Sequence, residues 1–276
     1  MRTRLLSAVA LAAAATLALS ACGSGSGGDD KKITIGIKFD QPGLGFQAGS
    51  TYSGFDVDVA TYIAKKLGYD ADQITWKESP SAQRESLLSS HQVDMVVATY
   101  SITDERKKTV AFAGPYFVAG QDLLVANDNS DITGPDALAG KKLCSVTGST
   151  SAQKIKDTYA DTVQLVEYPG YAECVTALTS GAVDAVTTDD IILAGLAAQP
   201  QNKGKVKLVG SPFSEESYGV GIPQDSTQCQ AISDAITSMI SDGSWQKFLD
   251  KNTDGTGYKP DADKNPPTVA PCGASS

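Results

Sequence analysis

Short hydrophobic runs alternate with amphipathic segments along most of the chain. In its first half, runs rich in β-branched residues predict strands at residues 33–38, 74–78 and 93–99. Apolar positions three and four residues apart predict helices at 55–68 and 82–90. Strands that alternate with helices are typical of βαβ units, so we expect an α/β fold with a mainly parallel sheet.

The alternation begins again near Lys141 and suggests a second α/β lobe. It predicts strands at 142–146, 163–168, 183–189 and 205–209, and helices at 149–160, 171–181 and 190–199. A further strand at 211–222 and helices at 226–242 and 244–251 would complete the first lobe. The backbone would then cross between the lobes twice, and two crossings make a hinge.

Two segments resemble each other at a constant offset of 90 residues, namely Leu88–Val96 and Leu178–Val186. Each has the pattern of a helix end, a turn and a strand. Thr99 and Asp189 therefore occupy corresponding positions just beyond a strand. Because ligands bind outside the carboxyl ends of the strands in open α/β sheets, we expect both residues at a binding edge.

The first 22 residues, MRTRLLSAVALAAAATLALSAC, combine two arginines, an apolar run and small residues. This pattern predicts an export signal at 1–21. Leu19–Cys22 resembles a bacterial lipobox, in which the cysteine is diacylated and becomes the new N-terminus. We expect Cys22 to anchor the chain to the outer face of the cell membrane, with residues 22–32 as a flexible tether. The protein would then be extracytoplasmic.

Charge and composition exclude several functions. The 276 residues include 23 basic and 32 acidic side chains, and removal of Arg2 and Arg4 with the signal changes the net charge from −9 to −11. An acidic chain of this kind argues against a nucleic-acid partner. The single histidine, His91, leaves almost no material for a metal centre or a histidine-based triad, and no cofactor is expected.

Four cysteines remain after Cys22, an even number in an oxidising compartment. Three pairings are possible. We favour Cys144 with Cys174, which would join neighbouring elements of one lobe, and Cys229 with Cys272, which would hold the proline-rich tail to a helix. The spacings do not resemble a zinc site.

The segment ATYSITDERKK at 98–108 has the local pattern of a helix start. Thr103 is a suitable cap, and Asp104 and Glu105 suit the positive end of the helix dipole. Local structure alone therefore explains this segment, including Arg106.

A family resemblance is carried by four runs: GFDVDVATYIAKKLG, VDMVVATYSITDERKKTVAFAGPYF, SVTGSTSAQKI and VDAVTTDD. They resemble the extracellular solute-binding proteins of polar amino-acid ABC transporters, over nearly the whole mature chain. KFDQPGLGF, ESPSAQRE and the cysteine positions are most similar to actinobacterial glutamate-binding lipoproteins. The resemblance implies a type II periplasmic-binding-protein fold, in which two α/β lobes joined by a two-strand hinge close around one free amino acid and present it to a permease.

On that fold, lobe 1 would comprise residues 33–117 and 217–276, and lobe 2 with the hinge segments would comprise 118–216. The two crossings would lie near 116–121 and 213–217.

The resemblance also implies roles for residues that grip the backbone atoms of the ligand. Arg106 would hold the α-carboxylate with its planar guanidinium fork, and Ser101 would add its hydroxyl and N–H. The Thr99 carbonyl would accept from the ammonium. From the other lobe, Thr150 would offer a helix N-terminus to the carboxylate, and Asp189 would balance the ammonium.

The ligand side chain would be bound by Ser81 and Arg84, with Thr147 from the other lobe. Arg84, Arg106 and Asp189 sum to +1, which zwitterionic glutamate neutralises. Glutamine would leave Arg84 enclosed without a partner, at a cost of roughly 3 to 5 kcal/mol. We therefore expect L-glutamate, with glutamine and aspartate as alternatives.

Two further residues have less defined roles. Tyr171 stands where some relatives place a histidine, and it would donate to the distal carboxylate. Lys38 would either supply positive charge or pair with Asp40 or another nearby acid.

Other functional classes have weaker signals. Ser151 and Lys154 form an SxxK pattern, but no SDN or KTG partner follows. A dehydratase with an acid in the cleft would need Glu167 or Glu173, and a solvated helix face is the simpler explanation of both. A sensor domain that reports amino acids to a membrane partner is a third alternative. We expect a binding protein without catalytic residues.

Overall fold

The structure is a computed structural model that describes residues 31–159 and 161–272. The predicted export signal, the lipobox with Cys22 and residues 22–30 of the predicted tether lie outside the described residues. Two five-stranded sheets form the framework of residues 31–272, and a separate hairpin pairs β2 (Phe46–Ala48) with β3 (Thr51–Ser53).

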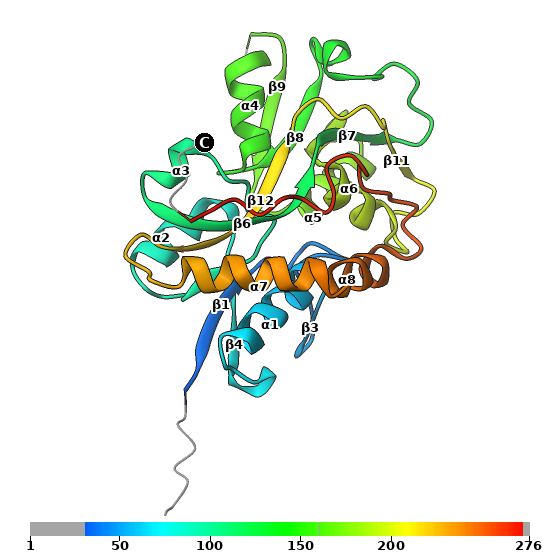
Figure 1. Cartoon of the computed structure of the whole chain (residues 1–276). Helices are drawn as coiled ribbons and strands as arrows, with labels where there is room; N and C mark the ends of the chain where they lie inside the picture. Colours follow the sequence, from blue (N-terminus) through cyan, green and yellow to red (C-terminus); the bar gives the residue numbers. More distant parts are fainter. Residues whose placement is uncertain (1–30, 160, 273–276) are drawn as a thin grey trace, which may run out of the picture. The chain divides into compact units, whose positions relative to one another are not determined.

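The first sheet has the strand order β4-β1-β5-β12-β6. These strands are β4 (Ile74–Glu78), β1 (Ile33–Ile37), β5 (Met95–Val96), β12 (Glu216–Pro223) and β6 (Val110–Ala119). Helices α1 (Phe55–Lys66), α7 (Cys229–Ser241) and α8 (Ser244–Thr253) pack together beside it, as Figure 1 shows. The shorter elements on this sheet are η1 (Ala71–Gln73), η2 (Ser81–Gln83), α2 (Arg84–Ser89) and α3 (Asp104–Lys107).

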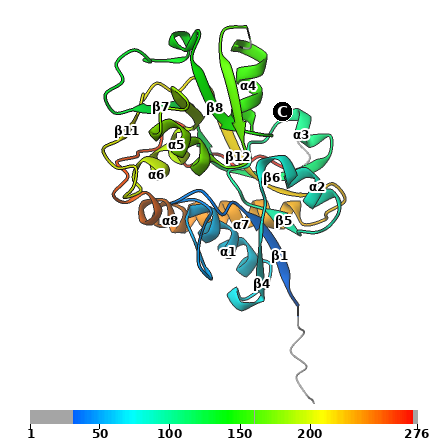
Figure 2. The same cartoon turned by 180° about the vertical axis from the view of Figure 1, so that it is seen from behind.

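The second sheet has the order β11-β7-β10-β8-β9. Its strands are β11 (Val206–Leu208), β7 (Gln121–Ala126), β10 (Ala185–Asp189), β8 (Lys142–Val146) and β9 (Gln164–Tyr168). Helices α4 (Thr150–Tyr159), α5 (Tyr171–Thr179) and α6 (Asp190–Ala197) pack on it, and Figure 2 shows them from behind. A 3₁₀ turn, η3 (Pro135–Leu138), precedes β8.

Both sheets are mixed, which corrects the expectation of a mainly parallel sheet. β12 runs antiparallel to β5 and β6, and β7 runs antiparallel to β10 and β11. The predicted strand 93–99 is also shorter than expected and ends at Val96. The reason is local, because Thr99 adopts a φ of 46° and its N–H donates to Asp56, so this segment leaves the ladder.

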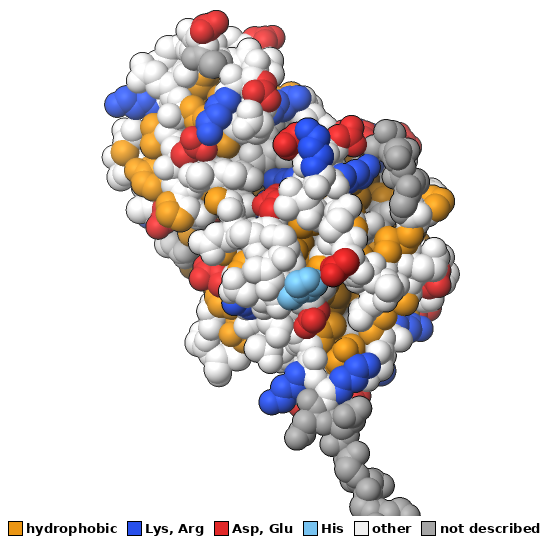
Figure 3. Space-filling model, turned by 90° about the vertical axis from the view of Figure 1, so that its left-hand side faces the viewer, with side chains coloured by type: hydrophobic (Ala, Val, Ile, Leu, Met, Phe, Trp, Pro, Cys, Tyr) orange, Lys and Arg blue, Asp and Glu red, His pale blue; other side chains and the backbone are white. Residues whose placement is uncertain are grey.

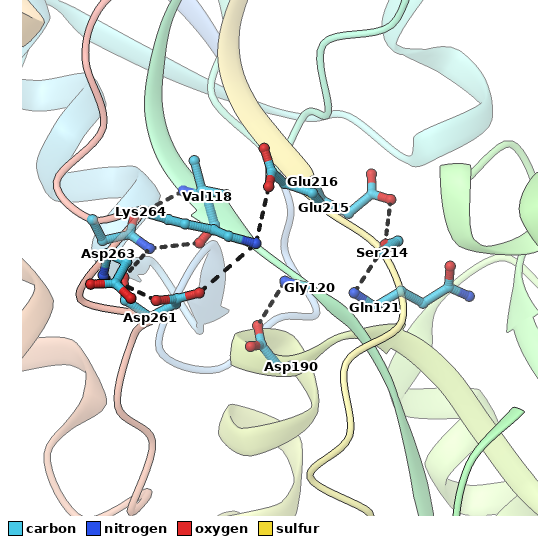
Figure 4. Close-up of polar contacts among 11 residues, drawn as sticks. Val118, Gly120, Gln121, Asp190, Ser214, Glu215, Glu216, Asp261, Asp263 and Lys264 are labelled. Carbon is cyan, nitrogen blue, oxygen red and sulfur yellow. Dashed lines mark hydrogen bonds and ion pairs between the residues drawn. The ribbon is translucent and has the colours of Figure 1, made fainter.

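Two connections join the sheets and run side by side. β6 of the first sheet is followed by β7 of the second after Gly120 alone. The returning segment precedes β12, and there the Phe213 N–H donates to the Gln121 carbonyl at 2.8 Å. The Gln121 N–H in turn donates to Ser214 Oγ at 3.1 Å (Figure 4). These hydrogen bonds hold the two connections together.

The tail after α8 lies against the same connections. Lys264 forms an ion pair of 3.0 Å with Glu215 (Figure 4). The Asn265 side chain donates to the Val118 carbonyl at 2.8 Å and accepts from the Val118 N–H at 2.9 Å. The Asn265 amide thus satisfies both backbone groups of Val118, as a neighbouring strand would do at this edge of the first sheet. The tail is therefore attached to both segments that join the sheets.

Both of the cysteine pairings that the sequence favoured are present. Cys144 of β8 is bonded to Cys174 of α5, and Cys229 at the start of α7 is bonded to Cys272 in the tail. The first bond joins a strand to its adjacent helix. The second closes the tail back onto α7.

Candidate functional site

A small cavity lies where the two sheets face each other. Residues from both sheets line it: Ser81, Arg84, Thr99, Ser149, Thr150, Ser151, Tyr171, Thr188, Asp189 and Ile192. Six of the ten residues proposed from the sequence belong to this lining. Because it is polar and charged but deeply buried, it suits a small zwitterion better than an apolar ligand.

Arg106 lies beside this cavity at the start of α3. The Thr103 hydroxyl accepts from the Arg106 N–H at 3.2 Å, as the cap pattern predicted. The buried guanidinium then donates to the Ser101 carbonyl at 2.7 Å and to the Gly148 carbonyl at 3.2 Å. Its Nε lies 3.2 Å from a Glu85 carboxylate oxygen. Arg106 thus connects the first sheet to the loop before α4.

Gly148 allows this loop to approach so closely. Its φ is 77°, and a Cβ there would lie 2.7 Å from the Ala82 Cα. Any other residue would therefore push the loop away from η2. Nearby, the hydroxyls of Ser101 and Thr150 lie 3.3 Å apart, so the two sides of the cavity also meet through side chains.

Thr99 is held in its unusual conformation by a buried acid. The Asp56 carboxylate accepts from the Thr99 N–H at 3.0 Å and from the Tyr116 hydroxyl at 2.7 Å. Burial raises the pKa of Asp56 to about 6 in spite of these hydrogen bonds. Asp56 was not anticipated from the sequence, because an acidic residue in the first turn of a helix is ordinarily exposed and interacts with the helix dipole.

Arg84 at the start of α2 is 2 % exposed, and no ion pair among the described residues includes it. One guanidinium nitrogen donates to the Ala98 carbonyl at 2.9 Å, and its Nε has no hydrogen-bond partner in the described part of the chain. Burial, followed by the charge of Arg106, lowers the pKa of Arg84 to about 10. A buried cation without an ion-pair partner is costly, and an anion beside it would lower that cost.

Asp189 supplies the acidic side of the cavity. It ends β10 and accepts from the Tyr218 hydroxyl of β12 at 2.5 Å. Its other oxygen has no partner among the described residues. Burial, with the neighbouring charge of Glu216, raises the pKa of Asp189 well above its ordinary value. A ligand ammonium would supply the missing partner.

Four lining residues, all from the lobe of the second sheet, were not predicted as ligands: Ser149, Ser151, Thr188 and Ile192. The Ser149 hydroxyl accepts from the Ala152 N–H at 2.9 Å and so caps α4. The STS pattern is the signal that could have identified this cap. Tyr171, which was predicted, is buried in the lining, and burial raises its pKa to about 12.

Four predicted residues are not part of the lining: Ser101 and Arg106 lie beside it, and Thr147 and Lys38 make other contacts. Thr147 is exposed, and its N–H donates to the Tyr168 carbonyl. Lys38 is buried but lies 3.6 Å from Asp40, which is the pairing that the sequence left open. The Asp40 carboxylate also accepts from the Tyr171 N–H at 2.9 Å, so it joins the first strand region to α5.

The two acids considered for a dehydratase are also elsewhere. Glu167 forms an ion pair of 2.7 Å with Lys156, and the Glu173 carboxylate accepts from the Gly170 N–H at the start of α5. Neither lines the cavity. His91 lies on the surface, 3.6 Å from Asp225, and Figure 3 shows it there among acidic side chains.

Within residues 31–159 and 161–272, no group of histidine, cysteine and acidic side chains has the arrangement of a metal site. None of the helices described is long and apolar enough to cross a membrane.

Comparisons with known proteins show which proteins this chain resembles. The model of the family "Bacterial extracellular solute-binding proteins, family 3" matches residues 33–254. The glutamate-binding protein GluB of Corynebacterium efficiens is 46% identical over 269 residues, which covers 91% of each chain. The glutamine-binding protein GlnH of Bacillus subtilis is 37% identical over 86% of this chain and 92% of its own.

A solved structure is similar as well. The GluR0 ligand-binding core from Nostoc punctiforme, in complex with L-glutamate, superimposes with a TM-score of 0.71 at 30% identity. The match covers 80% of this chain and 99% of that one. The fold is thus the type II periplasmic-binding-protein fold, with two lobes of mixed sheets. These relatives bind solutes and are not enzymes, and the chain belongs to the bacterial extracellular solute-binding proteins of family 3.

Proposed function

We propose that this protein is the substrate-binding component of an ABC importer and that it captures L-glutamate between its two lobes. The observation that carries the choice of glutamate is Arg84, a buried guanidinium without an ion-pair partner in the described chain. A distal carboxylate would satisfy its charge, whereas the neutral amide of glutamine would not. Leaving such a charge unpaired costs roughly 3 to 5 kcal/mol, or more than a hundredfold in affinity.

The ligand backbone would be held by both sides of the cavity. Arg106 would bind the α-carboxylate, exchanging its longer contact with the Gly148 carbonyl for the ligand. Ser101 and Thr150 would bind the same carboxylate, and Asp189 with the Thr99 carbonyl would bind the ammonium. Ser81 and Tyr171 line the cavity with Arg84 and would complete the side-chain pocket.

The charges of the surroundings support assigning the discrimination to Arg84. The sequence count treated Arg84 and Arg106 alike, but Glu85 forms an ion pair with Arg106 and offsets its charge. Arg84 has no such pair in the described part of the chain. Thr147 and Lys38 lie outside the cavity lining, and we propose no direct ligand contact for either.

Further parts of the proposal concern organisation and location. Residues 33–117 and 217–276 would form one lobe and 118–216 the other, with the segments around Gly120 and Ser214 as the hinge. Cys22 would carry the lipid that holds the protein at the outer face of the cell membrane, close to its permease. A role as an amino-acid sensor would be favoured instead if the neighbouring genes encoded a receptor and no permease.

Calorimetric titration of the mature protein with glutamate, aspartate, glutamine and arginine tests the proposal. We expect glutamate to bind most tightly, with one site per chain. Tighter binding of glutamine would refute the role of Arg84, and failure of all four ligands would refute the amino-acid function.

A further inference from the structure

The ring of Tyr100 lies beneath both arginines of the proposed site. The centre of the Arg84 guanidinium is 4.2 Å from the ring centroid, and that of Arg106 is 4.9 Å from it. The ring itself is fully buried. Both distances are within the range of an attractive cation–π contact.

The neighbouring strands hold this ring in place. Phe112 of β6 packs edge-on against Tyr100, with 4.8 Å between the ring centroids. The Tyr100 carbonyl accepts from the Gly219 N–H of β12. Gly221 of the same strand leaves room for the ring, because a Cβ there would lie 2.6 Å from the Tyr100 Cε1. The ring therefore has little freedom to move.

The two cations need such a support. Arg84 and Arg106 repel each other, and the charge of Arg106 helps to lower the pKa of Arg84. Arg84 makes one hydrogen bond, to Ala98, and has no ion pair among the described residues. The negative face of an aromatic ring stabilises a guanidinium without supplying an opposite charge that would compete with an anionic ligand. Glu85 already offsets the charge of Arg106, and a second carboxylate paired with Arg84 would neutralise the cation assigned to the distal carboxylate.

We propose that Tyr100 is a positioning residue that orients Arg84 and Arg106 for the two carboxylates of one acidic amino acid. Its ring, and not its hydroxyl, carries this role. The proposal rests on the proposed function, since it assigns carboxylates to both arginines. It adds a specificity determinant that touches no ligand atom in the proposed arrangement.

The test replaces Tyr100 by phenylalanine and by phenylalanines that carry one, two and three ring fluorines. Fluorine withdraws electron density from the ring face with little change in shape. We expect Tyr100→Phe to bind glutamate within about threefold of the wild type and the fluorinated series to weaken stepwise, to about tenfold in total. The same fluorinated residues at Phe55 are the matched control, because Phe55 is buried among aromatic rings and no described lysine or arginine lies over it.

Tyr100→Leu provides an independent measurement. We expect it to weaken glutamate by about tenfold or more and to lower the ratio of glutamate to glutamine affinity, because Arg84 lies closer to the ring. A fluorinated series with constant affinity, or a Tyr100→Leu variant that loses only thermal stability, would overturn the proposal. The titration of the wild type separately tests whether glutamate is the ligand. If another amino acid binds instead, the affinity of the fluorinated series is measured for that amino acid, whose α-carboxylate Arg106 would bind.

Discussion

The Tyr218 hydroxyl of the first sheet donates to the Asp189 carboxylate of the second at 2.5 Å. This contact connects β12, the strand after the second connection between the sheets, with the acid proposed to bind the ligand ammonium. Both residues are buried. The hydrogen bond therefore orients Asp189 and partly offsets the cost of burying its carboxylate.

Tyr218→Phe should lower the free energy of unfolding by about 1 to 3 kcal/mol, because it leaves a buried oxygen unsatisfied. Urea denaturation measures this loss. Tyr62→Phe is the matched control, since it removes a similar bond to Asp242 at the surface. Equal losses in both variants would show that burial does not decide the cost.

Arg84→Gln should weaken glutamate by more than about a hundredfold while it changes glutamine much less. The reason is that it removes the cation assigned to the distal carboxylate and leaves the groups around the ligand backbone in place. Calorimetric titration with both ligands checks this.

Arg106→Ala serves as the comparison for Arg84→Gln. It should abolish binding of every amino acid, because all share the α-carboxylate. If Arg84→Gln lost both ligands equally, the side-chain assignment would be wrong.

Asp56→Asn should change how stability depends on pH. A buried carboxyl whose pKa rises from 3.8 to about 6 on folding contributes stability below pH 3.8, and this is lost as the pH rises through about 6. The contribution is about 3 kcal/mol. Between these pH values, the free energy of unfolding of the wild type should therefore fall by about this amount relative to Asp56→Asn. Parallel curves for the two proteins would contradict the buried, ionisable state of Asp56.

The Cys229–Cys272 bond should stabilise the folded chain by roughly 3 to 4 kcal/mol, because it closes a loop with a sequence separation of 43. Replacement of both cysteines by serine should lower the melting temperature in calorimetry. The same double replacement at Cys144 and Cys174, with a separation of 30, should cost slightly less. A tail that stays protected from protease in the Cys229/Cys272 variant would indicate that Asn265 and Lys264 hold it without the disulfide.

Much of the local structure followed from the sequence. The alternation of strands and helices predicted the α/β class, and the cap pattern placed the helix start before Arg106, because both depend on neighbours within a few residues. The pattern did not anticipate the mixed sheets. Strand direction depends on how the chain returns, and the return of β12 beside β6 is a contact across about a hundred residues.

Patterns along the chain were enough to predict most of the elements, the favoured cysteine pairs and a set of polar residues at strand ends. Which of these residues meet depends on how the two sheets pack against each other. This packing brings Arg84, Asp189 and Tyr171 to one cavity, leaves Thr147 exposed and places Tyr100 beneath two arginines. Burial and contacts between distant segments arise from the packing of whole sheets, and the hydrophobic period of a single segment carries no information about them.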